Sequence, residues 1–146
     1  NKLINFNLDI YGKVEDNFYF SKVKNLFTKK IRYLGPLNQN NKYKILKKYD
    51  VLLYPSLSEN FGLIILEALN SGLYVIMSKK LPWKFLPIEF GKLIPFNKKI
   101  LEKNIFLLKK NIRKFENKKK TNLRNYLFNN FSWDRISKKY IDLYQV

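Results

Sequence analysis

The sequence contains no cysteine and no histidine. Without cysteine the chain forms neither a disulfide framework nor a thiolate metal site, which fits a reducing compartment. Without histidine it lacks the side chain that most often serves as a general base or a metal ligand. We therefore expect no metal site built on either residue type.

Acidic residues are few: there are 11 of them against 29 lysines and arginines, a formal charge of +18. A balance of this kind suggests anionic partners such as nucleic acid, acidic lipid headgroups or phosphorylated substrates. An AT-rich coding sequence explains it equally well, because Asn, Lys, Ile, Phe and Tyr are abundant together and the lysines would then simply coat the surface.

Long apolar runs are also absent. We find no run of about 18 apolar residues and no signal-peptide pattern, so we expect no membrane-spanning helix. We expect a cytoplasmic protein, with peripheral contact at the inner membrane face as a further expectation. The chain of 146 residues has the length of one domain and shows no internal repeat or low-complexity linker. It begins with Asn1 instead of methionine, so we expect a fragment or a split subunit.

One stretch of the chain has the pattern of a strand, a tight loop and a helix. Residues 51–54 are apolar and read as a buried strand, which Pro55 and the next serine end. Helix formers follow over about 61–70, and Gly72 supplies a left-handed stop at the end of this helix. The first N–H groups of such a helix lack internal partners and suit an anion, which Gly62 would let approach closely.

Two glutamates belong to this stretch. Glu67 is the single charged residue within a mostly apolar helix, where a carboxylate is costly unless something bonds to it. One interpretation is a structural pair with a lysine or arginine, and the other is a carboxylate that accepts from ligand hydroxyls. Glu59, at the loop tip, would then serve a second set of hydroxyls on the other side of a bound phosphate.

The remaining segments alternate between strand and helix patterns. We expect strands over 1–11, 31–34, 74–77 and 91–95, and helices over 16–27, 42–49, from 100 to about 115, over 121–130, and after an N-cap at Ser132. Apolar residues expected to face inward are Phe18, Val23, Leu26 and Phe27 in the first helix and Leu101, Ile105, Leu108, Ile112 and Phe115 in the helix from 100 to about 115. The alternation predicts an α/β fold: a Rossmann-like parallel sheet with helices on both faces and ligand beyond the carboxyl ends of the strands.

Two further residues allow two interpretations each. Trp83 follows a proline and would either line a sugar pocket by stacking or fill the core. Lys42 would either reach a phosphate or remain a solvated lysine at a helix start.

The motif residues resemble those of a known family. Glu59-Asn60-Phe61-Gly62, then Glu67-Ala68-Leu69 and a small-residue stop at Gly72, are similar to the family 4 retaining glycosyltransferases of the GT-B fold, the glycosyl transferases group 1. Further agreements in the family's order are Tyr33 to Leu37, Tyr49-Asp50, Tyr74 to Ile76 and Phe131-Ser132-Trp133. The resemblance covers most of the chain but only the C-terminal half of such an enzyme.

The resemblance implies a nucleotide-sugar-binding domain over 1–146, without the N-terminal acceptor domain. It implies that Glu59 is the catalytic residue and holds sugar hydroxyls, that the N–H groups of Asn60, Phe61, Gly62 and Leu63 hold the distal phosphate, and that Glu67 holds the ribose. The backbone near Leu37 would carry the base. The family's diphosphate-gripping Arg and Lys would lie upstream of Asn1, so weak donor binding is expected.

The implied activity is hexosyl transfer, with retention, from a nucleotide-sugar donor to a glycan or lipid-linked acceptor, using no metal and no further cofactor. An N-terminal GT-B domain would be needed in cis or in trans. Two alternatives remain open. One is a basic nucleic-acid-binding module, which the charge permits although no recognisable motif supports it. The other is a non-catalytic subunit that completes a split glycosyltransferase.

Overall fold

The computed structural model describes residues 6–111 and 118–144. They belong to two compact units, with the boundary after Lys42. The strands form two parallel sheets, one in each unit, where the sequence pattern predicted a single sheet. The prediction of parallel α/β architecture is confirmed, but the single sheet is wrong. Apolar patterning identifies strands and cannot identify which strand edges pair, so the division was not visible in the sequence.

The first unit holds two short strands and one helix. Its elements are β1 (Leu8–Ile10), α1 (Asn17–Lys24), β2 (Ile31–Tyr33) and a 3₁₀ turn (Gln39–Asn41). β1 and β2 are parallel, and Asp9 accepts two hydrogen bonds from the Arg32 guanidinium at 2.8 and 2.7 Å. Asp16 caps α1 by accepting from the backbone N–H of Tyr19 at 2.9 Å, which offsets one of the unpaired donors of the first turn.

The predicted inward face of α1 is partly wrong. Phe18 and Leu26 are 71% and 66% exposed. Phe20 instead packs edge-on against Tyr33, with ring centroids 4.9 Å apart, and also contacts Phe27. The helix ends at Lys24, so the residues beyond it no longer follow helical spacing and the predicted face cannot continue.

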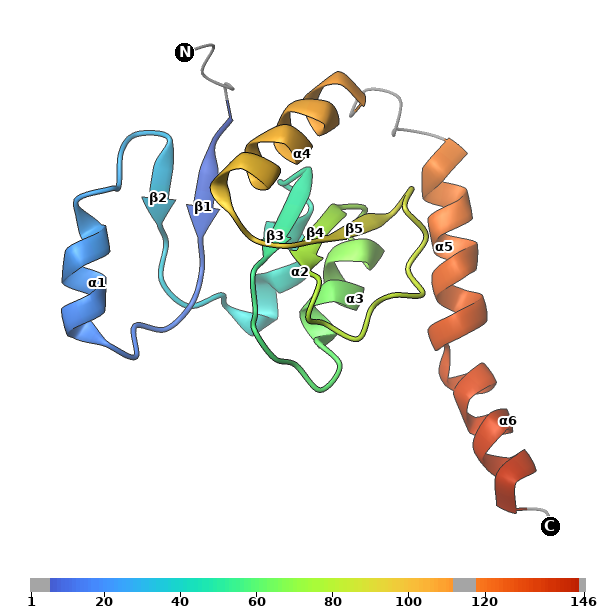
Figure 1. Cartoon of the computed structure of the whole chain (residues 1–146). Coiled ribbons are helices and arrows are strands. Elements are labelled where there is room, and N and C mark those ends of the chain that lie inside the picture. Colours follow the sequence, from blue (N-terminus) through green and yellow to red (C-terminus); the bar gives the residue numbers. More distant parts are fainter. Residues whose placement is uncertain (1–5, 112–117, 145–146) are drawn as a thin grey trace. The chain divides into compact units, whose positions relative to one another are not determined.

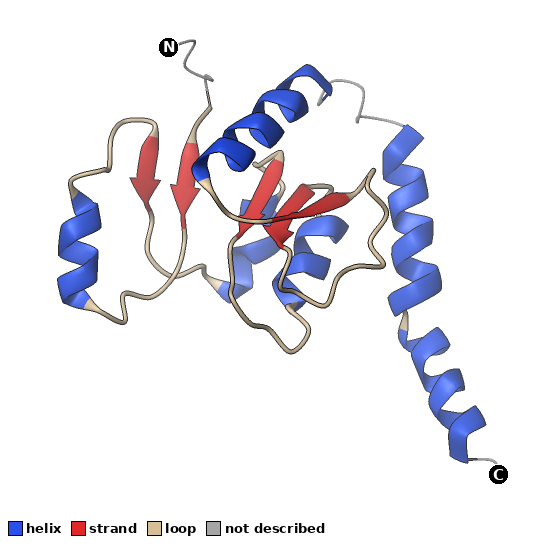
Figure 2. Cartoon of the chain, in the orientation of Figure 1, coloured by secondary structure: helices blue, strands red, loops and turns tan. Residues whose placement is uncertain are grey.

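The second unit contains the three-stranded sheet and its covering helices (Figures 1 and 2). Its elements are α2 (Lys42–Leu46), β3 (Val51–Tyr54), α3 (Leu63–Asn70), β4 (Tyr74–Ser78), β5 (Gly91–Ile94), α4 (Lys98–Asn111), α5 (Lys118–Phe131) and α6 (Trp133–Tyr144). The strand order is β3-β4-β5, and both pairs are parallel. Gly72 follows α3 with a φ of 88°, the left-handed stop that the sequence predicted.

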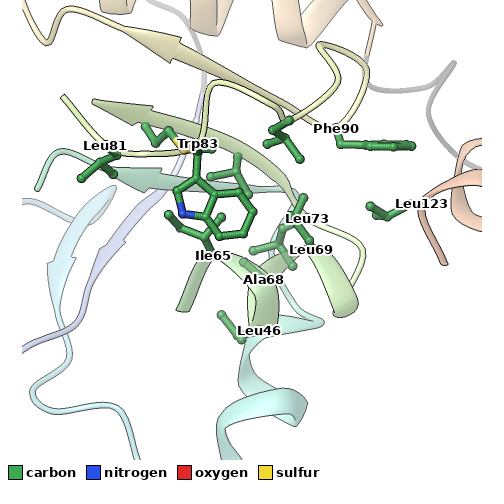
Figure 3. Close-up of a cluster of buried hydrophobic side chains, with 12 residues drawn as sticks. Leu46, Ile65, Ala68, Leu69, Leu73, Leu81, Trp83, Phe90 and Leu123 are labelled. Atoms are coloured by element: carbon green, nitrogen blue, oxygen red, sulfur yellow. The ribbon is translucent and has the colours of Figure 1, made fainter. Parts of the chain in front are cut away.

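The central strand β4 divides the core into two layers. All five of its residues are buried, and alternate side chains point to opposite faces because a strand has a period of two. On one face, Val75 and Met77 join a cluster with α3, α2, α5 and Trp83 (Figure 3). On the other face, Tyr74 and Ile76 pack with residues of β5 and α4. Helices thus cover both faces of this sheet, as predicted.

The later helices lie at their predicted positions, with one correction. Leu101 and Leu108 of α4 pack on the sheet as expected, whereas Ile112 and Phe115 lie outside the described residues. Ser132 precedes α6 as predicted, but its hydroxyl oxygen is buried and makes no hydrogen bond within the described structure, so it is not a side-chain cap. Along α6 the large apolar side chains remain exposed: Trp133, Tyr140, Ile141, Leu143 and Tyr144.

No helix within residues 6–111 and 118–144 combines the length and the apolar character needed to cross a membrane.

Gly91 is held in a position that tolerates no side chain. A Cβ atom there would lie 2.6 Å from the Leu86 side chain and 2.8 Å from the backbone oxygen of Val75. We expect Gly91→Ala to lower the free energy of unfolding by about 1 to 3 kcal/mol, because β4 and β5 would have to separate. Urea unfolding measures the change, with exposed Lys99→Ala as a control expected to stay within about 0.5 kcal/mol. Equal stability of the two variants would contradict the close packing.

Candidate functional site

Two loops leave the same edge of the three-stranded sheet. Tyr54, the last residue of β3, pairs with Met77, the next-to-last residue of β4. Because the two strands are parallel, residues 55–62 and the segment that begins at Lys79 both start at the carboxyl edge. This edge is where α/β sheets usually bind ligands. The loop after β3 then leads directly into α3.

The start of α3 has no side-chain cap. Gly62 occupies the cap position with φ 78° and ψ 65°, and no side chain bonds to the first-turn N–H groups from that position. A Cβ atom at Gly62 would lie 3.1 Å from the Ile65 side chain. The positive φ at this position is also a backbone conformation that residues with a side chain rarely adopt. The glycine thus permits a sharp entry into the helix and leaves backbone donors suited to an anion. The helix begins at Leu63, two residues after the predicted start.

Glu59 is oriented by two hydroxyl groups, one at the end of β3 and one on its own loop. Its Oε1 accepts from the phenol of Tyr54 and from the Ser56 hydroxyl at 3.4 Å. Burial, and then the bond to Glu59, raise the pKa of Tyr54 to about 12. Sequence reasoning found Glu59 and missed Tyr54 and Ser56. The available signal was a tyrosine at the end of the strand, five residues before the acid.

Glu67 lies on the side of α3 that faces away from the sheet. It is half-buried and lines a pocket of about 500 Å³ between α3 and α5. The pocket is also lined by Tyr43, Leu63, Leu66, Asn70, Arg124, Asn125, Leu127, Phe128, Phe131 and Ser132. The carboxylate therefore has access to a cavity of ligand size, as its functional interpretation requires.

Trp83 fills the core beneath the loop and does not line a sugar pocket. The side chain is fully buried, and its indole Nε1 donates to the backbone oxygen of Phe61 at 2.6 Å. Its ring lies 5.1 Å from that of Phe61 and 5.8 Å from that of Phe131, at the end of α5. Of the two interpretations of Trp83, core packing is therefore correct. The indole also fixes the residue that immediately precedes Gly62.

The predicted site residues fall into two groups. Residues 59–63 are contiguous around the start of α3, and Glu67 follows one turn further along the same helix. Leu37 is half-buried and belongs to the first unit. Lys42 donates to the Gln39 side chain at 2.8 Å, so in this structure it has a local partner.

Among the described residues, no group of three or more acidic side chains could hold a metal ion.

The raised pKa of Tyr54 predicts a pH effect on stability. The folded state favours the neutral phenol of Tyr54. The contribution of this phenol to the free energy of unfolding is therefore complete below pH of about 10 and is lost as pH rises toward about 12. We expect Tyr54→Phe to lose less stability than the unchanged chain when urea unfolding is compared at pH 9 and pH 11. Tyr140→Phe, at an exposed tyrosine of α6, should behave like the unchanged chain. Identical pH dependence of all three would contradict the assignment.

The bond between Trp83 and Phe61 predicts a stability effect of its own. Trp83→Phe keeps an aromatic ring but removes the N–H donor and some volume, and we expect it to cost about 1 to 3 kcal/mol of unfolding free energy. Trp133→Phe is a matched control, because Trp133 is the other of the two tryptophans and is 81% exposed. Equal unfolding midpoints for the two variants would show that the indole is not a structural anchor.

Comparison with known proteins gives relatives that are much longer than this chain. Over 71 residues, 47% of this chain and 13% of that protein, it is 37% identical to the GtfA subunit of UDP-N-acetylglucosamine–peptide N-acetylglucosaminyltransferase of Limosilactobacillus reuteri subsp. suis. A crystal structure of a GtfA/B complex matches 94% of this chain and 29% of that chain, with a TM-score of 0.63 and 22% identity. The pneumococcal O-GlcNAc transferase GtfA, in complex with UDP and GlcNAc, matches 68% of this chain and 20% of that chain, with a TM-score of 0.49 and 30% identity. The chain thus spans less than a third of each relative.

The fold agrees with the first of these structures, as expected for a GT-B α/β architecture. The family model of the glycosyl transferases group 1 matches residues 1–85, more than half of the chain. The matched range contains both glutamates, Gly62 and Trp83. The chain belongs to the glycosyl transferases group 1 family.

Proposed function

We propose that this chain supplies the donor site of a retaining glycosyltransferase that moves a hexosyl group from a nucleotide sugar to an acceptor. One observation carries the proposal: along the chain, Glu59 precedes and Glu67 follows the N-terminus of α3, which has no side-chain cap. Two hydroxyl-binding carboxylates flanking a phosphate-binding helix end match the order of sugar, diphosphate and ribose in a nucleotide sugar. Membership of the family supports the same assignment.

Each group has a distinct role in this proposal. Glu59, held by Tyr54 and Ser56, accepts hydrogen bonds from the hydroxyls of the transferred sugar. The backbone N–H groups near Gly62 face the distal phosphate, where negative charge grows as the glycosidic bond breaks. Fixed dipoles aimed at that charge stabilise the transition state because they need not reorganise. Glu67 accepts from the ribose hydroxyls in the pocket beside α3.

The curated relative suggests which substrates to test first. Its name specifies UDP-N-acetylglucosamine as donor and a peptide as acceptor, and the aligned part of that protein is 37% identical to this chain. We propose the same donor for this chain and a peptide as its acceptor, ahead of the glycan or lipid-linked acceptors expected from the sequence. That relative is a subunit, so we further propose that the site is completed by another domain or chain. We also propose that transfer uses no metal and no further cofactor.

Nucleotide binding by the purified chain tests the proposal. Thermal-shift titrations with UDP, GDP and ADP and with their sugar conjugates should show stabilisation by one base series. A ligand that binds only the folded state adds about 2.7 kcal/mol at roughly a hundredfold excess over its dissociation constant. We expect Glu67→Ala to weaken this binding about tenfold or more, since a hydrogen bond to a charged group contributes about 1.5 to 3 kcal/mol.

Glu102→Ala is the matched control, because Glu102 is an exposed glutamate on α4, which covers the opposite face of the sheet. It should bind nucleotide like the unchanged chain. A shift that persists in Glu67→Ala would place the ribose elsewhere. If no nucleotide stabilises the chain even at millimolar concentration, the donor-site proposal fails, and a steep loss of nucleic-acid affinity with salt would support the nucleic-acid alternative.

A further inference from the structure

Tyr54 bonds to the one carboxylate of the loop that leads into α3. Its phenol donates to Oε1 of Glu59, and both residues are half-buried. The Ser56 hydroxyl lies 3.4 Å from the same oxygen, but it also lies 2.9 Å from the backbone oxygen of Ser58. A hydroxyl has one proton to donate, and the shorter contact is the one to Ser58. Tyr54 is therefore the principal restraint on the Glu59 carboxylate.

The Glu59 side chain also lies beside the start of α3. A Cβ atom at Gly62, the residue in the cap position, would lie 3.8 Å from Cγ of Glu59. The carboxyl group comes next along that side chain, so it is within reach of the N–H groups that follow Gly62. Within the described structure, however, the bonds that Glu59 accepts come from Tyr54 and Ser56. The carboxylate is thus adjacent to the helix end without capping it.

A carboxylate beside a helix N-terminus is expected to turn toward it. A side-chain oxygen that accepts from the first-turn N–H groups stabilises a helix, and a negative charge there also interacts favourably with the helix dipole. Without the bond to Tyr54, Glu59 would be free to do both. It would then compete with an anionic ligand for the same N–H groups, and its effective concentration would be high because it belongs to the same chain.

We propose that Tyr54 is a positioning residue of the donor site: it holds the Glu59 carboxylate away from the start of α3 and so keeps the N–H groups there for the ligand. The inference rests on the proposed donor site and adds the residue that keeps two of its parts separate. Tyr54 acts through Glu59. Because both bonds to Glu59 end on Oε1, Oε2 stays open to a hydroxyl group of the sugar in the described structure.

A double-mutant cycle on UDP binding tests the inference, because UDP carries no sugar for Glu59 to bind. GDP and ADP are run in parallel, and the diphosphate that binds the unchanged chain most tightly is then used for all variants. The variants are Tyr54→Phe, Glu59→Gln and the two combined. Tyr74→Phe is the matched control, since this phenol also donates a hydrogen bond, to the Ile88 backbone oxygen at 3.0 Å, but belongs to the first residue of β4, at the amino edge of the sheet. Circular dichroism and thermal unfolding confirm that each variant is folded.

We expect Tyr54→Phe to weaken diphosphate binding about tenfold, because a hydrogen bond to a charged group is strong enough to shift the competition by that factor. In the Glu59→Gln background the same substitution should change the affinity by less than about twofold, since the competing charge is gone. Tyr74→Phe should bind like the unchanged chain. A tyrosine that only stabilises the fold would cause the same loss in both backgrounds, and that result would overturn the inference.

The amide protons of Leu63 and Ile64 give a second readout that needs no ligand. In proton–nitrogen NMR spectra of the free chain, we expect Tyr54→Phe to shift these signals downfield as the Glu59 carboxylate bonds to the helix end. Adding Glu59→Gln should return them toward their original positions. Amide signals that do not move in Tyr54→Phe would overturn the inference.

Failure of this inference is distinguishable from failure of the donor site. Diphosphate binding that depends on Glu67 but not on Tyr54 would overturn the inference and leave the donor site intact. An unchanged chain that binds no nucleoside diphosphate would overturn the donor site and the inference together.

Discussion

The candidate site depends on the buried indole of Trp83. Its single N–H donates to the carbonyl of Phe61, and its ring packs against aromatic rings from the loop before α3 and from the end of α5. Three segments that are distant in the sequence therefore share one anchor. A buried N–H without a partner is costly, so the Phe61 carbonyl has to remain where the indole needs it. That requirement fixes the loop immediately before Gly62.

The same loop concentrates opposing electrostatic demands within a few residues. Glu59 must remain available to hydroxyl groups, and it belongs to the loop that leads into the uncapped start of α3. Its bonds to Tyr54 and Ser56 orient the carboxylate from the β3 side. A phenol with a raised pKa stays a donor throughout the neutral range, so the orientation does not change with physiological pH.

The large positive charge of the chain gains a meaning only when its location is known. Spread over the surface, 29 basic residues suggest nothing more specific than an anionic partner or a biased coding sequence. The structure separates lysines such as Lys47 and Lys48, at the amino edge of the sheet, from Lys79 and Lys80 at the carboxyl edge. Parallel strands place the loops that follow them at the same edge, so Lys79 and Lys80 come after β4 at the edge where the loop before α3 also begins.

The sequence by itself determined the alternation of strands and helices, the left-handed stop at Gly72 and the motif around Glu59 and Glu67, because periodicity and turn chemistry are local properties. The tertiary structure decided which strands pair, and so gave two sheets where one was predicted. It also decided that Phe18 is exposed, that Trp83 is core, and that a pocket opens beside Glu67. These outcomes depend on contacts between segments that are distant in the sequence. The residue pattern within one segment does not specify which other segment packs against it.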